Sequence, residues 1–102
     1  MIRHICMFQL KKEANGKSKA RNLEEALRRL DEMKTIDLIK RFEVVTNYEQ
    51  APENNYDLSL IFDFDTMQDL VAYQKHPMHV EFRDFITPVR ENRACIDFEI
   101  SQ

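Results

Sequence analysis

The sequence predicts a single α+β domain whose elements run strand, helix, strand, strand, helix, strand (βαββαβ). Four stretches alternate between apolar and polar residues, two intervening stretches show helical spacing, and the connection between the middle strands is too short for a helix. With 102 residues the chain has room for one modest core, so we assign residues 1–102 to one domain.

The first strand and the first helix are predicted within residues 2–34. Residues 2–10 are apolar on both parities of the chain, which is typical of a central strand with both faces covered. A polar loop around Asn15 and Gly16 follows. Apolar residues then recur at helical spacing with charged residues between them, and they predict an amphipathic helix over residues 18–34.

The middle of the chain predicts an antiparallel hairpin. Residues 38–48 alternate with one wetter face, and residues 56–64 alternate strictly, with aromatic and aliphatic side chains on one parity. The polar segment between them, residues 49–55, carries Pro52 and is too short for a crossover helix. The two strands are therefore expected to pair antiparallel.

The second helical region is predicted to consist of two short helices. Asp65, followed three residues later by Gln68, matches a helix-capping pattern, and this first helix continues until His76, where a proline follows. The next helix ends at Thr87, which also precedes a proline. Residues 93–100 then alternate and predict the fourth strand. All helices are expected on one face of a four-stranded antiparallel sheet.

The opposite face of this sheet needs a cover. Because the first strand is apolar on both sides, we expect a second copy of the chain to pack there, since a self-complementary two-fold interface is the commonest way to bury such a patch. The sequence thus predicts a homodimer. The alternative is a monomer with scattered exposed apolar residues.

Composition excludes several function classes. With 15 Lys and Arg against 18 Asp and Glu, and no block of five or more like charges, the chain lacks the basic stripe of a nucleic-acid binder. Its one glycine, Gly16, excludes Gly-rich phosphate loops and dinucleotide fingerprints. The apolar start is too short for a secretory signal or a membrane span. We therefore expect a cytoplasmic protein with no nucleic-acid or membrane partner.

The two cysteines, Cys6 and Cys95, lie in alternating stretches near opposite ends of the chain and form no Cys-x-x-Cys pair. Free cysteine is among the most buried residue types, and disulfides are rare in the cytoplasm. We expect two buried, reduced thiols.

Two of the three histidines are expected to point inward. Phe82 follows His79 at helical spacing, so the His79 ring faces the apolar interior. A partly desolvated, neutral imidazole there can act as a general base if a carboxylate orients it, and the alternative is a core histidine bonded to a backbone carbonyl. His4 shares the parity of Cys6 and needs a hydrogen-bond partner if buried, with packing favoured over catalysis.

His76 immediately precedes a proline at the predicted end of a helix, where a cationic ring meets the negative end of the helix dipole, so we expect His76 to cap that helix. His76, His79, His4 and Asp97 are also residue types that bind metal ions, so a metal site formed by these four is an alternative. The intervening proline separates the two rings of the His-x-x-His pair, so we predict no bound metal and no cofactor.

Tyr73 and Asp97 are two further polar candidates. Tyr73 carries a phenol that can donate or accept a hydrogen bond, although its helical spacing also fits ordinary core packing. Asp97 lies inside an apolar strand, so it is either a solvated carboxylate or a buried one with a partner.

Four segments together resemble the stress-responsive A/B barrel (Dabb) family: residues 2–8, residues 73–79, residues 85–89, and the closing Asp-Phe pair at 97–98. The most specific element is Tyr-x-x-His-Pro-x-His over residues 73–79, and the resemblance spans nearly the whole chain. It implies a ferredoxin-like subunit that pairs sheet to sheet into a dimeric α+β barrel, in agreement with the dimer expected from the open sheet face.

The resemblance also implies site residues. A plant cyclase of this family closes a linear polyketide by aldol-type condensation without a cofactor, and its catalytic residues match His79, Tyr73 and Asp97. His79 would remove a proton α to a carbonyl, Asp97 would hold the His79 tautomer, and Tyr73 would stabilise the enolate oxygen. We add His4, His76 and Phe82 as expected ligand-binding residues.

Three functions follow from these expectations. The first is a stress-linked homodimer that binds a small hydrophobic molecule between its helices and its sheet. The second is a cofactor-free cyclase, lyase or isomerase acting on a polyketide-like carbonyl compound, with His79 as general base. The third is a structural dimer without a pocket. Binding is placed ahead of catalysis, because a fold predicts activity poorly.

Overall fold

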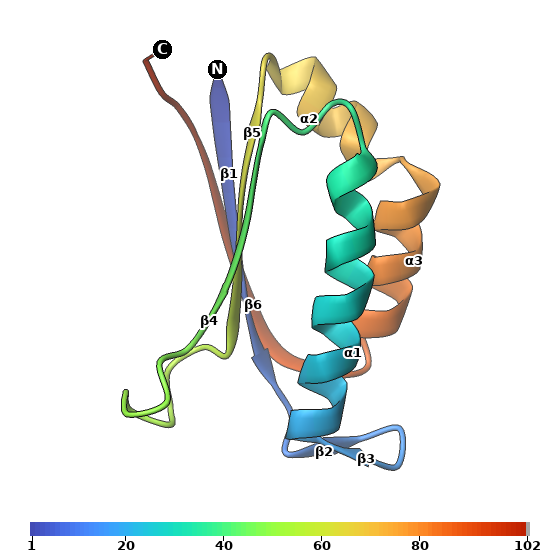
Figure 1. The fold of residues 1–102 in the computed structure, drawn as a ribbon, viewed down its shortest axis with the longest axis vertical. Helices are drawn as coiled ribbons and strands as arrows, with labels where there is room; N and C mark the ends of the chain where they lie inside the picture. Colours follow the sequence, from blue (N-terminus) through green and yellow to red (C-terminus); the bar gives the residue numbers. More distant parts are fainter. Residues whose placement is uncertain (102) are drawn as a thin grey trace.

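Three helices cover one face of a four-stranded antiparallel sheet (Figure 1). The structure is a computed structural model and describes residues 1–101. Sheet order is β4-β5-β1-β6, with the first strand at the centre beside both the hairpin and the last strand. The chain thus has the ferredoxin-like α+β fold that the sequence predicts.

The strands are β1 (Ile2–Leu10), β4 (Arg41–Thr46), β5 (Leu58–Phe64) and β6 (Arg90–Glu99). The helices are α1 (Lys19–Glu32), α2 (Met67–Gln74) and α3 (Pro77–Ile86), and a 3-10 turn, η1 (Met33–Thr35), follows α1. Both strands of the hairpin are shorter than expected. β4 begins three residues after and ends two residues before the predicted stretch 38–48, and β5 begins two residues after the start of the predicted stretch 56–64.

Local chemistry sets the helix starts. Ser18 caps α1, because its hydroxyl accepts the backbone N–H of Arg21. Thr66 caps α2 by accepting the backbone N–H of Asp69, so the expected cap at Asp65 is wrong by one residue. Threonine and aspartate are both good caps, and the strand before this helix decides which one reaches the first turn.

The loop expected around Asn15 contains a small ribbon. Strands β2 (Glu13–Ala14) and β3 (Lys17–Ser18) pair antiparallel across a two-residue turn. Asn15 and Gly16, the two turn residues, have φ angles of 54° and 73°. This left-handed pair is what a tight hairpin requires, and Asn-Gly is the sequence that adopts it most readily.

The core lies between the sheet and the helices. It joins the inward side chains of β1 and β5 to the buried faces of the three helices. Tyr73 of α2 is fully buried among aromatic rings, with Phe62 at a centroid distance of 5.9 Å and Phe64 at 5.1 Å. Phe62 also stacks on Phe42 of the edge strand at 4.9 Å. This cluster fixes α2 against the centre of the sheet.

The other face of the sheet carries no helix (Figure 1). Its exposed apolar side chains include Met7, Val45, Ile96 and Phe98, and Ile96 retains 59% of its accessible surface. These residues come from β1, β4 and β6, so the apolar surface extends across the sheet. The open face that the sequence predicts is therefore present.

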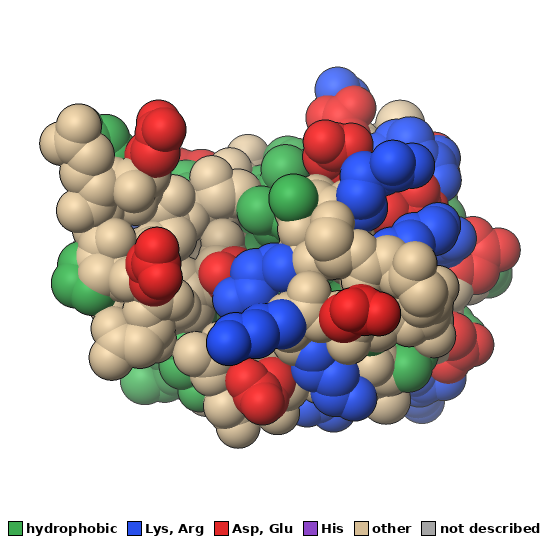
Figure 2. Space-filling model, turned by 90° about the horizontal axis from the view of Figure 1, so that it is seen from below, with side chains coloured by type: hydrophobic (Ala, Val, Ile, Leu, Met, Phe, Trp, Pro, Cys, Tyr) green, Lys and Arg blue, Asp and Glu red, His purple; other side chains and the backbone are tan. Residues whose placement is uncertain are grey.

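Charges of both signs are mixed over the end of the molecule formed by the β2–β3 ribbon and the start of α1 (Figure 2). Lysine and arginine side chains lie next to aspartate and glutamate there. Within residues 1–101 no helix is both long and apolar enough to cross a membrane.

Candidate functional site

A cavity of about 200 Å³ lies between α3 and the β1–β6 side of the sheet. Its apolar lining comes from Phe8 and Leu60 of the sheet and from Phe82 and Ile86 of α3. Of the expected site residues, His4, His79 and Phe82 line this cavity, whereas Tyr73, His76 and Asp97 do not. Half of the site residues expected from the sequence therefore lie on the cavity lining.

His4 and Asp97 are directly opposite each other in the β1–β6 pair. The His4 ring is buried, and its Nδ1 lies 2.5 Å from Oδ1 of Asp97, whose side chain is one-third exposed. A carboxylate that faces Nδ1 holds the proton there, so Nε2 is the nitrogen that accepts. His4 thus has the partner that its burial requires.

The expected pairing of Asp97 with His79 is wrong, because Asp97 bonds His4 instead. Nδ1 of His79 is buried and has no hydrogen-bond partner within the described chain, so a bond from this atom to a backbone carbonyl is also excluded. Burial is the main cause that lowers the pKa of His79 to about 4, and the nearby Arg83, His4 and Arg93 lower it further. The His79 ring is therefore neutral at neutral pH.

Tyr73 lies behind the site in the core. Its ring centroid is 4.7 Å from that of His79 and 6.4 Å from that of His4, so it contacts both histidines. Its hydroxyl is buried without a hydrogen-bond partner among residues 1–101, and burial raises the pKa of the phenol well above its usual value. The phenol stays protonated, and its ring packs against the two imidazoles on the side that faces the core.

His76 caps a helix, as expected, but it caps the helix that follows it and not the one that precedes it. It caps the N-terminus of α3, and its Nδ1 accepts the backbone N–H of Met78 at 3.1 Å. An accepting nitrogen carries no proton, so the expected cationic ring at a helix C-terminus is wrong. α2 ends at Gln74, before Pro77, as expected. The role of His76 differs because Pro77 occupies the first turn of α3, where proline is favoured, so the preceding His76 stands at the N-terminus of that helix.

The two cysteines form a disulfide between β1 and β6. They are directly opposite in the strand register, with Cα atoms 4.2 Å apart. Cys6 is buried and Cys95 is exposed at the sheet edge, so the expectation of two buried, reduced thiols is wrong. Sequence reasoning missed the pair because 89 positions separate the residues and only the strand register brings them together.

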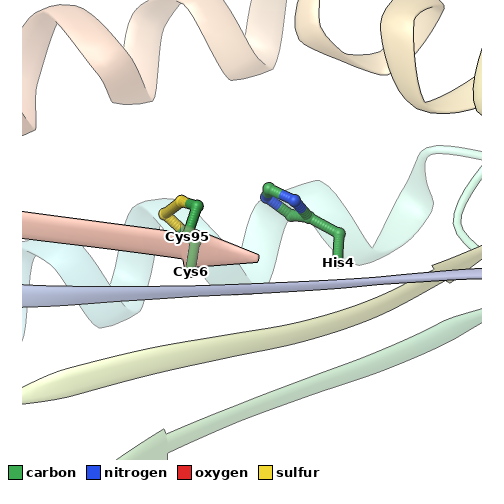
Figure 3. Close-up of side chains that lie close together, drawn as sticks. All are labelled: His4, Cys6 and Cys95. Carbon is green, nitrogen blue, oxygen red and sulfur yellow. A yellow bond between two sulfur atoms is a disulfide. The ribbon is translucent and has the colours of Figure 1, made fainter. Parts of the chain in front are cut away.

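Figure 3 shows His4 with its ring turned toward the two sulfur atoms. A ring nitrogen of His4 and the Sγ atoms of Cys6 and Cys95 all lie within 4.8 Å of one another. Within residues 1–101 this is the one group of three possible metal ligands of these types. The set weighed from the sequence, His76 and His79 with His4 and Asp97, is not brought together.

Three arginines on the lining were not anticipated. Arg83 comes from α3, and Arg90 and Arg93 come from β6. Arg83 makes a long, exposed ion pair with Asp84 at 3.4 Å, whereas Arg90 and Arg93 pair with no acidic side chain of the described residues. Scattered arginines give no sequence signal, because only the fold gathers them at one opening. Their charges favour an anionic ligand.

A family model described as the Stress responsive A/B Barrel Domain matches residues 2–100. The chain belongs to the Dabb family. This match covers the strands and helices that enclose the cavity and confirms the resemblance drawn from residues 73–79 and the two terminal strands. No curated protein matches the chain.

Solved structures of similar proteins share this Dabb fold. A dimeric ferredoxin-like protein of unknown function from Bacteroides fragilis is 26% identical, with a TM-score of 0.83 over 97% of this chain and 95% of that one. A Dabb protein from Mesorhizobium loti is 28% identical, with a TM-score of 0.70 over 99% and 97%. A hydroxynitrile lyase from Passiflora edulis, 16% identical with a TM-score of 0.79 over 99% and 94%, shares the fold.

Proposed function

We propose that this Dabb protein is a homodimer in which each protomer binds a small, mostly apolar molecule bearing a carboxylate or another anionic group. The observation that carries the proposal is the cavity, which joins an apolar wall to Arg90 and Arg93, two arginines that pair with no acidic side chain within residues 1–101. The aliphatic and aromatic side chains of the wall would contact the apolar part of such a molecule, and Arg90 and Arg93 would bind its anionic group.

The size of the cavity limits the ligand. Pockets for drug-sized molecules usually enclose about 300–1,000 Å³, so a cavity of about 200 Å³ suits a short-chain or single-ring acid. The two histidines on the lining, His4 and His79, supply hydrogen-bond donors or acceptors for a carbonyl oxygen. A carbonyl acid fits both the imidazoles and the arginines.

The open face of the sheet supports the homodimer. Ile96, Phe98, Val45 and Met7 expose apolar surface there, and a second copy of the same face would cover it. The Bacteroides fragilis protein, which shares the fold and 26% of the sequence, is dimeric. The cavity lies between the sheet and α3, on the other side of the sheet from this face.

A second candidate function is cofactor-free proton transfer on a carbonyl compound. It is favoured by the His4–Asp97 pair, in which the carboxylate holds one ring nitrogen and leaves the other to accept a proton. His79, kept neutral by burial, is the other candidate base, as expected from the sequence. In this scheme His4 or His79 takes the proton α to the carbonyl, and an arginine on the lining stabilises the enolate oxygen.

The test is a thermal-shift screen of the oxidised protein against short aliphatic and aromatic carboxylic acids, their α- and β-keto analogues and the matching amides. A ligand at 100 times its Kd adds about 2.7 kcal/mol to the free energy of unfolding. We expect acids to stabilise the wild type more than amides do, and expect Arg93→Gln and His79→Gln to lose the shift.

Arg21→Gln is the matched control, because Arg21 is an exposed arginine of α1 away from the cavity. The proposal fails if acids and amides stabilise equally or if Arg93→Gln and Arg21→Gln respond alike. If no compound stabilises the protein, the structural dimer becomes the favoured function. Loss of the α-proton signal of a bound keto acid in deuterated buffer would establish proton transfer, and its absence would leave binding alone.

A further inference from the structure

The Cys6, Cys95 and His4 group has the composition of a metal site rather than of a core contact. Cys6 and Cys95 are cross-strand neighbours, and His4 lies two residues before Cys6 on the same face of β1. All three side chains project toward the helix layer (Figure 3). Two sulfurs and one imidazole nitrogen are soft or borderline donors, which select thiophilic cations over Mg²⁺ or Ca²⁺.

The distances suit a tetrahedral cation. Zn²⁺ binds Cys sulfur at about 2.3 Å and His nitrogen at about 2.0–2.1 Å, so neighbouring donors around it stand about 3.5–3.8 Å apart. The donor atoms here lie within 4.8 Å of one another. Once the sulfurs are separated by reduction, side-chain movements of about 1 Å bring the three donors to these spacings.

Asp97 is not one of the three possible ligands, but it bonds the ring of one of them, His4. A metal-bound histidine usually donates its other ring N–H to a carboxylate, which fixes the tautomer and raises the basicity of the ligating nitrogen. His4 already holds this geometry, because its Nδ1 faces Oδ1 of Asp97 at 2.5 Å. Nε2 is therefore the nitrogen available to a metal.

We propose that the reduced protein binds one Zn²⁺ ion per chain through Sγ of Cys6, Sγ of Cys95 and Nε2 of His4. His4 and Cys6 also line the cavity, so the fourth ligand position is open to water or to a small anion there. The inference goes beyond the proposed function, because it requires neither the acid ligand nor the dimer.

The disulfide is the oxidised form of the same pair. A dithiol reductant opens it by thiol–disulfide exchange, in which the dithiol gives up two electrons and two protons and becomes a disulfide, while Cys6 and Cys95 become thiols. Zn²⁺ then displaces one proton from each thiol and binds two thiolates. A small-molecule disulfide reverses the first step and releases the ion, since disulfide sulfurs carry no thiolate charge.

The experiment is a titration of the full-length protein with Co²⁺, followed by competition with Zn²⁺. The protein is reduced with a dithiol, freed of excess reductant without oxygen, and compared with its oxidised form. We expect one Co²⁺ per reduced chain, with thiolate-to-cobalt charge-transfer absorption that Zn²⁺ abolishes, and none for the oxidised chain. Absence of these bands from the reduced protein, or equal binding by both forms, would overturn the proposal.

Variants separate this site from a structural effect. Cys95→Ser is expected to remove most of the charge-transfer absorption, and Asp97→Asn to keep the bands while weakening Co²⁺ binding about 10–100-fold. His76→Asn is the control, because asparagine retains the helix cap while an imidazole outside the group is removed. Unchanged affinity in both Cys95→Ser and Asp97→Asn contradicts the site. The acid screen uses oxidised protein, so failure of one proposal leaves the other standing.

Discussion

Asp97 accepts a hydrogen bond from Nδ1 of His4 across the β1–β6 pair, although the residues are 93 positions apart. This contact fixes the orientation of the one buried imidazole that faces both the cavity and the cysteines. Because Asp97 bonds His4, it does not orient His79. The His79 ring is neutral and packs against the Tyr73 ring. The two histidines therefore have different environments within one site.

The first prediction concerns the stability contributed by Asp97. Replacing Asp97 with Ala leaves Nδ1 of buried His4 without a partner, and an unsatisfied buried donor costs about 1–3 kcal/mol. Urea unfolding with the disulfide intact measures the loss. Glu99→Ala, at an exposed position of the same strand, is the control and is expected to change the free energy of unfolding by less than about 0.5 kcal/mol. Equal losses in the two variants would mean that His4 finds another partner.

The fold was predictable because its signals are local. The signals are strict alternation over residues 56–64, helical spacing over residues 18–34 and a short polar hairpin connection, and each lies within one short stretch of the chain. The errors are local too. The cap of the second helix is expected at Asp65, whereas Thr66 makes the bond. The break at Pro77 is as expected, but His76 caps the helix that follows the proline instead of the one before it.

The site was only partly predictable because strand register joins its members. His4, Cys6, Cys95 and Asp97 lie near opposite ends of the chain, and their two contacts exist only because β1 and β6 pair with Cys6 opposite Cys95. Alternation shows which face a residue takes and gives no information on its cross-strand partner. His79 and Phe82 were found because one helix carries both.

The second prediction is a pH dependence caused by His79. Its pKa is about 4 in the folded protein against an ordinary value of 6.5, so between these pH values the unfolded chain binds a proton that the folded protein does not. Stability therefore falls as pH decreases from 6.5 to about 4 and is unaffected by this group above that window. Because the ring is half-buried and water screens part of the penalty, we expect a loss of about 1–2 kcal/mol.

His79→Gln removes the titrating group and isolates this effect. Chemical unfolding at several pH values between 4 and 7 should show the wild type losing stability relative to the variant as the solution becomes more acidic. Parallel curves for the two proteins would show that His79 titrates with the same pKa in both states, and the lowering of its pKa by burial would then be wrong.

The third prediction tests the open face of the sheet. Ile96 exposes 59% of its surface there, and a lysine at this position would place two charges, one from each copy, inside a two-fold interface. We expect light scattering to give twice 12.2 kDa for the wild type and 12.2 kDa for Ile96→Lys at micromolar concentration. Val71→Lys on α2, an exposed β-branched residue of the helix layer, should remain a dimer. A wild-type mass of 12.2 kDa rules out the sheet-to-sheet homodimer.

The last prediction separates the ring of Tyr73 from its hydroxyl. The ring packs against Phe62, Phe64 and both histidines, so Tyr73→Ala should cost about 3–5 kcal/mol. The hydroxyl is buried without a partner in the described chain, so Tyr73→Phe keeps the packing, removes an unsatisfied group and should leave stability unchanged or raise it by about 1 kcal/mol. Acid binding by Tyr73→Phe should also match the wild type, because Tyr73 is not on the cavity lining. A loss of ligand binding with intact stability would instead place the phenol in the site, as the family resemblance of residues 73–79 implies, and would require the α2–α3 region to move when ligand enters.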